Sequence, residues 1–158
     1  MFTTVDINKG VKIMQETALN ITDAEWEVMR TVWANESITS KEVIRILGDK
    51  KEWKPGTIKT LLARLVDKGA LKTEQLERKY IYTAAVTEGE SINTYTEDIL
   101  SRVCNKQSGK VIINMIMDAT LSKADIAAMK EILEEKETTA ADEVPCECAA
   151  GQCECHLD

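Results

Sequence analysis

Four of the 5 cysteines of this 158-residue chain lie close together near the C-terminus. They form the pattern C-x-C-x4-C-x-C and are Cys146, Cys148, Cys153 and Cys155. Alternate residues of an extended chain share a face, so each C-x-C pair can present two sulfurs to one ion. Residues 149–152 can form the turn that brings the two pairs together, and Gly151 permits it. Four thiolates make a tetrahedral zinc(II) site and are also soft ligands that prefer copper(I), so we expect one of these metals here.

Other uses of these side chains compete with this interpretation. Disulfides are an alternative for four cysteines, but a reducing compartment disfavours them. A disordered tail that binds nothing is another alternative, which the symmetrical spacing argues against. His156 stands beside Cys155, but a terminal histidine is more often a bystander, so we leave it out of the site. Cys104 stands alone on an apolar helical face, and we expect it to be a small core residue rather than a ligand.

The charged residues are distributed very unevenly along the chain. The net charge is -7, yet residues 39–80 hold 11 basic and 6 acidic side chains. Clustered positive charge is typical of a site for a polyanion such as nucleic acid, and the charge of the whole chain hides it. A solvated charged surface is the alternative interpretation of the same counts.

Two capping boxes predict where two helices begin in and before this basic region. In each box a threonine and a glutamate three residues later satisfy backbone N–H groups reciprocally. The pairs are Thr22 with Glu25 and Thr39 with Glu42. The first helix should run to about Asn35. The second should cover residues 40–47, because Gly48 supplies a stop.

A third helix and a hairpin should follow. The helix should begin near Pro55, which tolerates a first-turn position, and end at Gly69. Its apolar residues form one stripe and are Ile58, Leu61, Leu62, Leu65 and Val66. Residues 70–84 then become strand-like, with strands at 71–74 and 79–83 around a polar turn at 75–78. Three helices and a hairpin in this order predict a winged helix-turn-helix, so the fold class is mainly α with a small β-hairpin wing.

The exposed face of the third helix has the residues that read DNA. In a helix-turn-helix the second helix of the pair enters the major groove, and here that is the helix after Pro55. Thr57, Thr60 and Arg64 align on one face, where arginine suits bidentate contact with guanine and threonine offers a hydroxyl and a methyl group. Phosphate contacts are expected from Lys54, Lys59 and Lys68, and from Arg78 and Lys79 at the wing. The alternative is that Thr57 is only a helix cap and Arg64 only a solvated charge.

The rest of the chain should be helical and then irregular. Residues 90–136 predict three short helices, the last capped by Ser122, and these cannot easily enclose a core of their own. Helices from a second copy would complete that core. The expected segments are an N-terminal extension at 1–20, a winged-helix DNA-binding domain at 21–87, a helical dimerisation region at 88–136, and a linker with a metal-sensing tail at 137–158.

The composition argues against an enzyme and against a membrane protein. The 1 histidine lies in the tail, and we find no nucleophile or phosphate-binding motif in a catalytic arrangement. No uncharged apolar run approaches the roughly 18 residues that indicate a membrane span. The first 20 residues lack the apolar core of a signal peptide. We therefore expect a cytoplasmic protein whose thiols stay reduced.

Three stretches of the sequence resemble one protein family. Residues 21–29, ITDAEWEVM, resemble the first-helix signature of the BlaI/MecI penicillinase-repressor family, and residues 53–69, WKPGTIKTLLARLVDKG, resemble its recognition-helix signature. The C-x-C-x4-C-x-C tail is similar to that of the copper-responsive CopY-type branch. The resemblance covers residues 21–155.

The resemblance implies a homodimer that binds double-stranded operator DNA, a palindrome with TACA-type half-sites, before copper-export genes. It also implies that zinc in the tail is compatible with repression and that copper(I) replaces zinc and releases DNA. A copper chaperone that delivers copper(I) is a further candidate partner.

Two other modes of action are disfavoured. Relatives that sense β-lactams are inactivated by cleavage at an Asn-Phe bond. The matching place here is Asn114-Met115, which argues against regulation by proteolysis. The alternative function is a cytosolic copper/zinc buffer or metallochaperone, but storage of ions needs no helix that reads a DNA groove.

Overall fold

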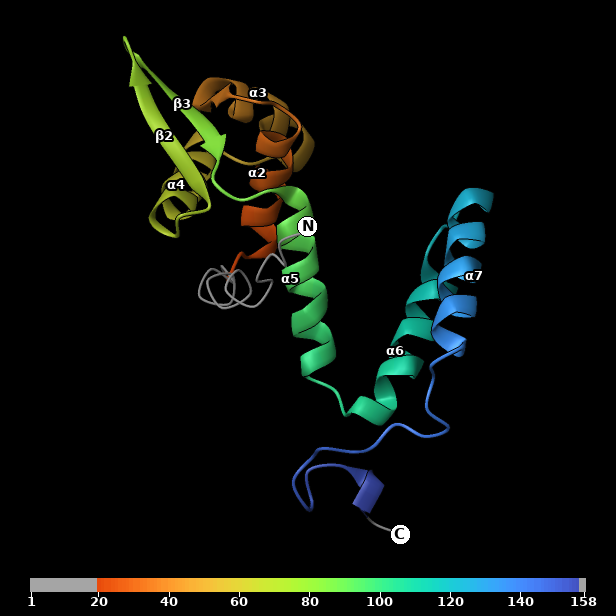
Figure 1. Ribbon diagram of the computed structural model, residues 1–158. Coiled ribbons are helices and arrows are strands. Elements are labelled where there is room, and N and C mark those ends of the chain that lie inside the picture. Colours follow the sequence, from red (N-terminus) through yellow and green to blue (C-terminus); the bar gives the residue numbers. More distant parts are fainter. Residues whose placement is uncertain (1–19, 157–158) are drawn as a thin grey trace, which may run out of the picture. The chain divides into compact units, whose positions relative to one another are not determined.

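The computed structural model describes residues 20–156, and the N-terminal extension up to residue 19 lies outside them. The described chain is mainly helical with one small antiparallel sheet, which confirms the predicted fold class (Figure 1). It forms two compact units, one ending at Tyr95 and one beginning at Thr96. The elements in order are α2 (Asp23–Trp33), β1 (Ile38–Thr39), α3 (Ser40–Lys51), α4 (Pro55–Asp67), β2 (Leu71–Leu76), β3 (Lys79–Ala84), α5 (Glu88–Ser101), α6 (Asn105–Asp118), α7 (Lys123–Glu137) and the short 3-10 helix η1 (Glu154–His156).

The first unit is a winged helix built around one apolar core. Helices α2 and α3 both begin with the predicted capping boxes, in which Thr22 and Thr39 exchange hydrogen bonds with Glu25 and Glu42. The core is formed by α2, α3, α4 and the first residues of β1 and β2. Its buried apolar side chains are Val28, Met29, Val32, Ile38, Val43, Leu47, Ile58, Leu61, Leu62, Leu65, Ala70 and Leu71.

Helix α3 extends further than the sequence predicted. Gly48 does not end it, and the helix continues to Lys51 before Glu52 takes a left-handed conformation with φ of 54°. A Cβ atom at Gly48 would lie 3.7 Å from the carbonyl oxygen of Trp53, so the glycine fits an ordinary packed position inside the helix. A glycine costs a helix only about 1 kcal/mol, and the packing of α3 on the core outweighs that cost.

The wing is a tight hairpin that joins a third strand. Strands β2 and β3 pair antiparallel from Leu71 opposite Ala84 to Leu76 opposite Lys79. The turn is therefore shorter than the predicted polar turn at 75–78, and Glu77 adopts a positive φ of 56° to make it. The strand β1, which the sequence did not predict, pairs with β3 and places β3 in the middle of the sheet.

Aromatic contacts join the start of α5 to the first unit. The indole nitrogen of Trp33 donates a hydrogen bond of 2.9 Å to the carbonyl of Val86, which lies just before α5. The ring of Trp26 lies 5.4 Å from that of Trp33 and 5.8 Å from that of Tyr95, measured between ring centroids. These contacts explain why the compact unit continues into α5.

The second unit has helices but no buried core of its own. Helix α7 begins at a capping box of Ser122 and Asp125, which confirms Ser122 as a cap. No residue from Thr96 to Cys155 is buried. Its large exposed apolar side chains include Ile112, Ile113, Met115, Ile116, Met117, Ile126, Ile132 and Leu133. Within residues 20–156, no helix is both long enough and apolar enough to cross a membrane.

Candidate DNA-binding surface and metal centre

The face of α4 opposite the core carries most of the residues predicted to contact DNA. Ile58, Leu61, Leu62 and Leu65 are buried and Val66 packs against the core, so the polar positions of the helix lie on the opposite face. The exposed members of the predicted set on and before α4 are Lys54, Thr57, Lys59, Thr60 and Arg64. The structure therefore separates this helix into an apolar inner face and a polar, basic outer face.

The hydroxyl groups of Thr57 and Thr60 on α4 can still accept a hydrogen bond from a ligand. The N-cap of α4 is Lys54 rather than Thr57, and no side chain caps the helix. The interpretation of Thr57 as only a cap is therefore wrong. The hydroxyl of Thr60 donates a hydrogen bond of 2.9 Å to the carbonyl of Gly56 in the previous turn, so the lone pairs of its oxygen can still accept one.

Two further members of the predicted set lie at the wing. Arg78 belongs to the turn between β2 and β3, and Lys79 is the first residue of β3. Both side chains are exposed. The tip of the hairpin thus has two adjacent positive charges, which suit contact with phosphates rather than bases.

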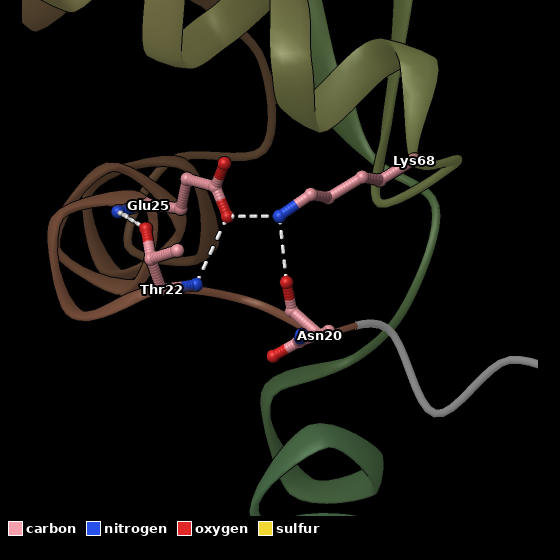
Figure 2. Close-up of polar contacts among 4 residues, drawn as sticks. All are labelled: Asn20, Thr22, Glu25 and Lys68. Atoms are coloured by element: carbon pink, nitrogen blue, oxygen red, sulfur yellow. Dashed lines mark hydrogen bonds and ion pairs between the residues drawn. The ribbon is translucent and has the colours of Figure 1, made fainter.

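Lys68, the remaining predicted phosphate contact, has a structural partner instead. Its ammonium lies 2.5 Å from Oε2 of Glu25 and donates a hydrogen bond of 2.6 Å to the carbonyl of Asn20 (Figure 2). Glu25 is buried, with 1% of its side chain exposed, and also accepts from the backbone N–H of Thr22. Lys68 therefore joins the end of α4 to the start of α2. This ion pair could not be predicted from the sequence, because the two residues are 43 positions apart.

The electrostatics of Glu25 are a balance of two opposing effects. Burial alone would raise the pKa of its carboxyl group, but the hydrogen bond from Lys68 and the bond from the backbone of Thr22 lower it. The net pKa lies below the ordinary value of 4.5, so Glu25 is charged at neutral pH. The charged carboxylate at the N-terminus of α2 also interacts favourably with the helix dipole.

The second unit brings all five cysteines together as reduced thiols. The sulfurs of Cys146 and Cys153 lie 3.4 Å apart, which brings the two C-x-C pairs to one place. The turn between the pairs forms as predicted, because Gln152 donates its backbone N–H to the carbonyl of Ala149 at 2.9 Å and Gly151 takes a φ of +81°. We call these five residues, Cys104, Cys146, Cys148, Cys153 and Cys155, the cysteine cluster.

The expectation for Cys104 was wrong. It does not lie in an apolar core but occupies the N-cap position of α6, and its side chain is half-buried. Its sulfur lies 3.5 Å from that of Cys146 and 3.7 Å from that of Cys155. The apolar residues around Cys104 in the sequence indicated a helical face, whereas the chain in fact breaks between α5 and α6 at this point.

The cysteine cluster fits a metal ion that prefers thiolates. The sulfurs of Cys104, Cys146, Cys148 and Cys153 all lie within 4.8 Å of one another. Zinc bonded to four sulfurs at about 2.3 Å holds them about 3.8 Å apart in a tetrahedron, so small side-chain shifts would complete such a site. The donor set equally suits copper(I), which favours soft sulfur ligands.

Contacts among the thiols shift their pKa values in different directions. Hydrogen bonds with Cys146 and with Cys104 raise the pKa of Cys148 and of Cys155, respectively, to about 12. The hydrogen bond with Cys146 instead lowers the pKa of Cys153. A bound cation would displace the protons of Cys148 and Cys155, and its positive charge would stabilise the thiolates that form.

Known proteins resemble this chain over most of its length. The family described as "Penicillinase repressor" matches residues 21–135. An uncharacterized 16.5 kDa protein from the ptsI 3' region of Latilactobacillus sakei is 39% identical over 145 residues, which cover 92% of this chain and 99% of that protein. The penicillinase repressor of Bacillus licheniformis is 36% identical over 115 residues, covering 73% of this chain and 90% of that protein. The solution structure of the DNA-binding domain of the repressor BlaI is 41% identical, covers 46% of this chain and 89% of that domain, and has a TM-score of 0.44.

Proposed function

The chain belongs to the penicillinase repressor family, whose members are DNA-binding transcriptional repressors rather than enzymes, and we propose that it is a copper-responsive repressor of this family. The observation that carries the proposal is the cysteine cluster, whose sulfurs are spaced for a thiolate-bound metal in a chain that also has a winged helix. In this proposal zinc(II) in the cluster is compatible with repression, and copper(I) causes release from DNA.

The exposed face of α4 would read the operator. Thr57, Thr60 and Arg64 would contact base edges in the major groove, because all three are exposed on the helix that follows the turn. The wing residues Arg78 and Lys79, together with Lys54 and Lys59, would contact phosphates. Lys68 belongs to this set only if DNA binding draws its ammonium away from Glu25.

A second copy of the chain would cover the exposed apolar side chains of α5, α6 and α7. Exposed apolar patches on soluble proteins commonly mark interaction sites, and the second unit has no buried residue of its own. A two-fold dimer would present two recognition helices to a palindromic operator about one DNA turn, or roughly 34 Å, apart. We propose that this homodimer acts in the cytoplasm and that a copper chaperone delivers copper(I) to it.

The change of metal would act through shape rather than through charge. Four thiolates around one zinc(II) carry the same formal charge as four thiolates around two copper(I) ions, so repulsion from DNA does not distinguish the two forms. Zinc imposes one tetrahedral centre, whereas copper(I) accepts lower coordination with bridging sulfurs. The polar linker from Thr138 to Pro145 joins the cluster directly to the end of α7, so a change in the cluster reaches the proposed dimer helices.

A copper titration of operator binding tests this function. Wild-type protein and a variant with Cys146, Cys148, Cys153 and Cys155 all replaced by Ser are loaded on operator DNA without oxygen. Copper(I) should release the wild-type protein and leave the variant bound, while native mass spectrometry counts the metals. Release of the variant by copper would exclude the tail as the sensor. Equal affinity for operator and random DNA would instead favour a metal buffer.

A further inference from the structure

Cys104 reaches the tail cysteines from a distant part of the sequence. It is 42 residues before Cys146 and 51 residues before Cys155, yet its sulfur is within 3.7 Å of both of their sulfurs. It also belongs to the group of four sulfurs that lie within 4.8 Å of one another, together with Cys146, Cys148 and Cys153. The best-spaced set of four thiols is thus not the set of four in the tail.

We propose that Cys104 is a thiolate ligand of the metal centre, so that metal binding ties the C-terminal tail to the start of α6. This inference rests on the proposed metal-sensing function and assigns it a further residue. A tetrahedral zinc ion takes four of the five sulfurs, and the geometry assigns Cys104, Cys146, Cys148 and Cys153 to it. The sulfur of Cys155 lies 3.7 Å from that of Cys104, so Cys155 is the fifth thiol of the cluster and stays outside this set of four.

The backbone around Cys104 suits a ligand. Cys104 is the N-cap of α6, with φ of −57° and ψ of 139°, and its side chain makes no capping hydrogen bond to the helix. The sulfur of Cys104 therefore interacts with the other thiols rather than with the backbone of its own helix.

Cys104 also supplies what the tail lacks, which is an anchor on regular structure. The tail from Ala140 to Gln152 has only turns and irregular backbone, and the short helix η1 has three residues. Cys104 stands between the two longer helices α5 and α6. A metal bound by both parts closes a loop that contains α6, α7 and the linker, and thereby restrains the segment proposed to form the dimer. Metal binding would then affect the junction between α5 and α6 as well as the tail.

Zinc binding to matched variants of the full-length protein tests this role. Cys104→Ser removes the proposed ligand. The control is Asn105→Ser, which introduces a serine at the next position and leaves Cys104 in place. We expect Cys104→Ser to weaken zinc binding at least about tenfold in competition with a chelator, because even indirect partners of a metal ligand contribute that much. Asn105→Ser should bind zinc as the wild-type protein does. With cobalt(II) in place of zinc, the sulfur-to-metal absorption should be weaker in Cys104→Ser because one thiolate is missing.

Alkylation of the wild-type protein provides a second readout that needs no mutation. Zinc should protect Cys104 from iodoacetamide as well as it protects Cys146, as measured by peptide mass spectrometry. Circular dichroism of the metal-free proteins checks that Cys104→Ser keeps its helices. Alkylation of Cys104 at the same rate with and without zinc, or zinc affinity unchanged in Cys104→Ser, would overturn the proposal. In that case loss of copper response in the four-Ser tail variant would still support the proposed function, so the two failures are distinguishable.

Discussion

The winged-helix unit and the unit after it bury their apolar side chains to very different extents. Among the residues that the structure describes, every buried apolar residue lies between Val28 and Leu71, whereas no residue from Thr96 to Cys155 is buried. Each unit contains at least one helix that begins with a capping box, so local helix signals do not account for the difference. The first unit is stabilised by its own core. The second unit has helices but no sheet and no buried core, so we expect a binding partner to contribute to its stability.

This difference matches the division of labour in the proposed function. A rigid domain holds Thr57, Thr60 and Arg64 at fixed positions on one helix, as recognition of base edges requires. A region without its own core is easier to rearrange, because a ligand that binds one arrangement better shifts the equilibrium toward it. In this chain the cysteine cluster lies entirely in the second unit, where such a shift costs least.

Removal of the second unit should have the largest effect. A chain of residues 20–101 keeps the whole core and α5, and should fold but remain monomeric. It should bind a palindromic operator at least about 100-fold more weakly than the full chain, because the second half-site no longer benefits from a linked partner domain. Sedimentation and fluorescence anisotropy measure the two properties. A truncated chain that is still dimeric would place the dimer contacts in the first unit and contradict the proposed role of the second.

A pair of leucine substitutions should separate the two units by their stability. Leu62 is fully buried in the core, so Leu62→Ala should lower the free energy of unfolding by about 2–5 kcal/mol at any protein concentration. Leu133 is 57% exposed on α7, so Leu133→Ala should leave the first unit unaffected and weaken the dimer. Urea unfolding at several protein concentrations tests both, since only dimer stability depends on concentration. Similar losses for both variants at high dilution would contradict the idea that α7 packs on a second copy.

The sequence predicted those features that depend on neighbouring residues. The capping boxes at Thr22 and Thr39, the proline start of α4 and the turn at Gly151 all follow from side-chain chemistry within four positions. The apolar stripe of α4 could also be predicted, because the residues at helical spacing are the ones that are buried there. These signals were sufficient for the winged-helix fold and for the outward position of Arg64.

The features that the sequence did not predict depend on contacts between distant residues. The cluster includes Cys104 because the chain turns between α5 and α6, and no local pattern marks a cysteine that meets another 42 positions later. Lys68 is half-buried beside Glu25 for the same reason, although its basic side chain fits a phosphate contact equally well in a linear pattern. Gly48 shows the opposite error, since a strong local stop signal was overridden by packing of α3.

Two substitutions in the first unit should sharpen its role as the reader of DNA. Arg64→Ala removes an exposed side chain from the recognition face and should cost roughly 1–3 kcal/mol of operator binding while relaxing base preference. Lys79→Ala, at the wing, should weaken operator and random DNA alike and reduce the salt dependence of binding. Affinity measured on both DNAs over a range of salt concentrations tests the pair. Equal losses of Arg64→Ala on operator and random DNA would contradict direct base contact.

The ion pair of Lys68 and Glu25 should give a smaller effect that belongs to stability rather than to DNA. Lys68→Gln leaves the buried carboxylate of Glu25 without its cationic partner. Because the Lys68 side chain is 31% exposed, solvent screens part of the loss, and we expect a cost of about 1–2 kcal/mol in the free energy of unfolding. Lys59→Gln, on the exposed face of the same helix, is the matched control. It should leave stability unchanged and reduce the salt dependence of DNA binding by about one unit of slope.

The ion pair of Lys68 and Glu25 should make stability depend on pH, whereas a phosphate contact of Lys68 would not. The pKa of Glu25 is below 4.5 in the folded protein, so its charged form contributes stability above that pH and loses it as the pH falls through the lowered pKa. The advantage of the wild-type protein over Lys68→Gln should thus be full at neutral pH and shrink progressively as the pH falls below the ordinary carboxyl pKa of 4.5. Urea unfolding of both proteins across this range measures the difference. A constant difference would show that Lys68 stabilises α4 without involving Glu25, and its ammonium would again be available for DNA.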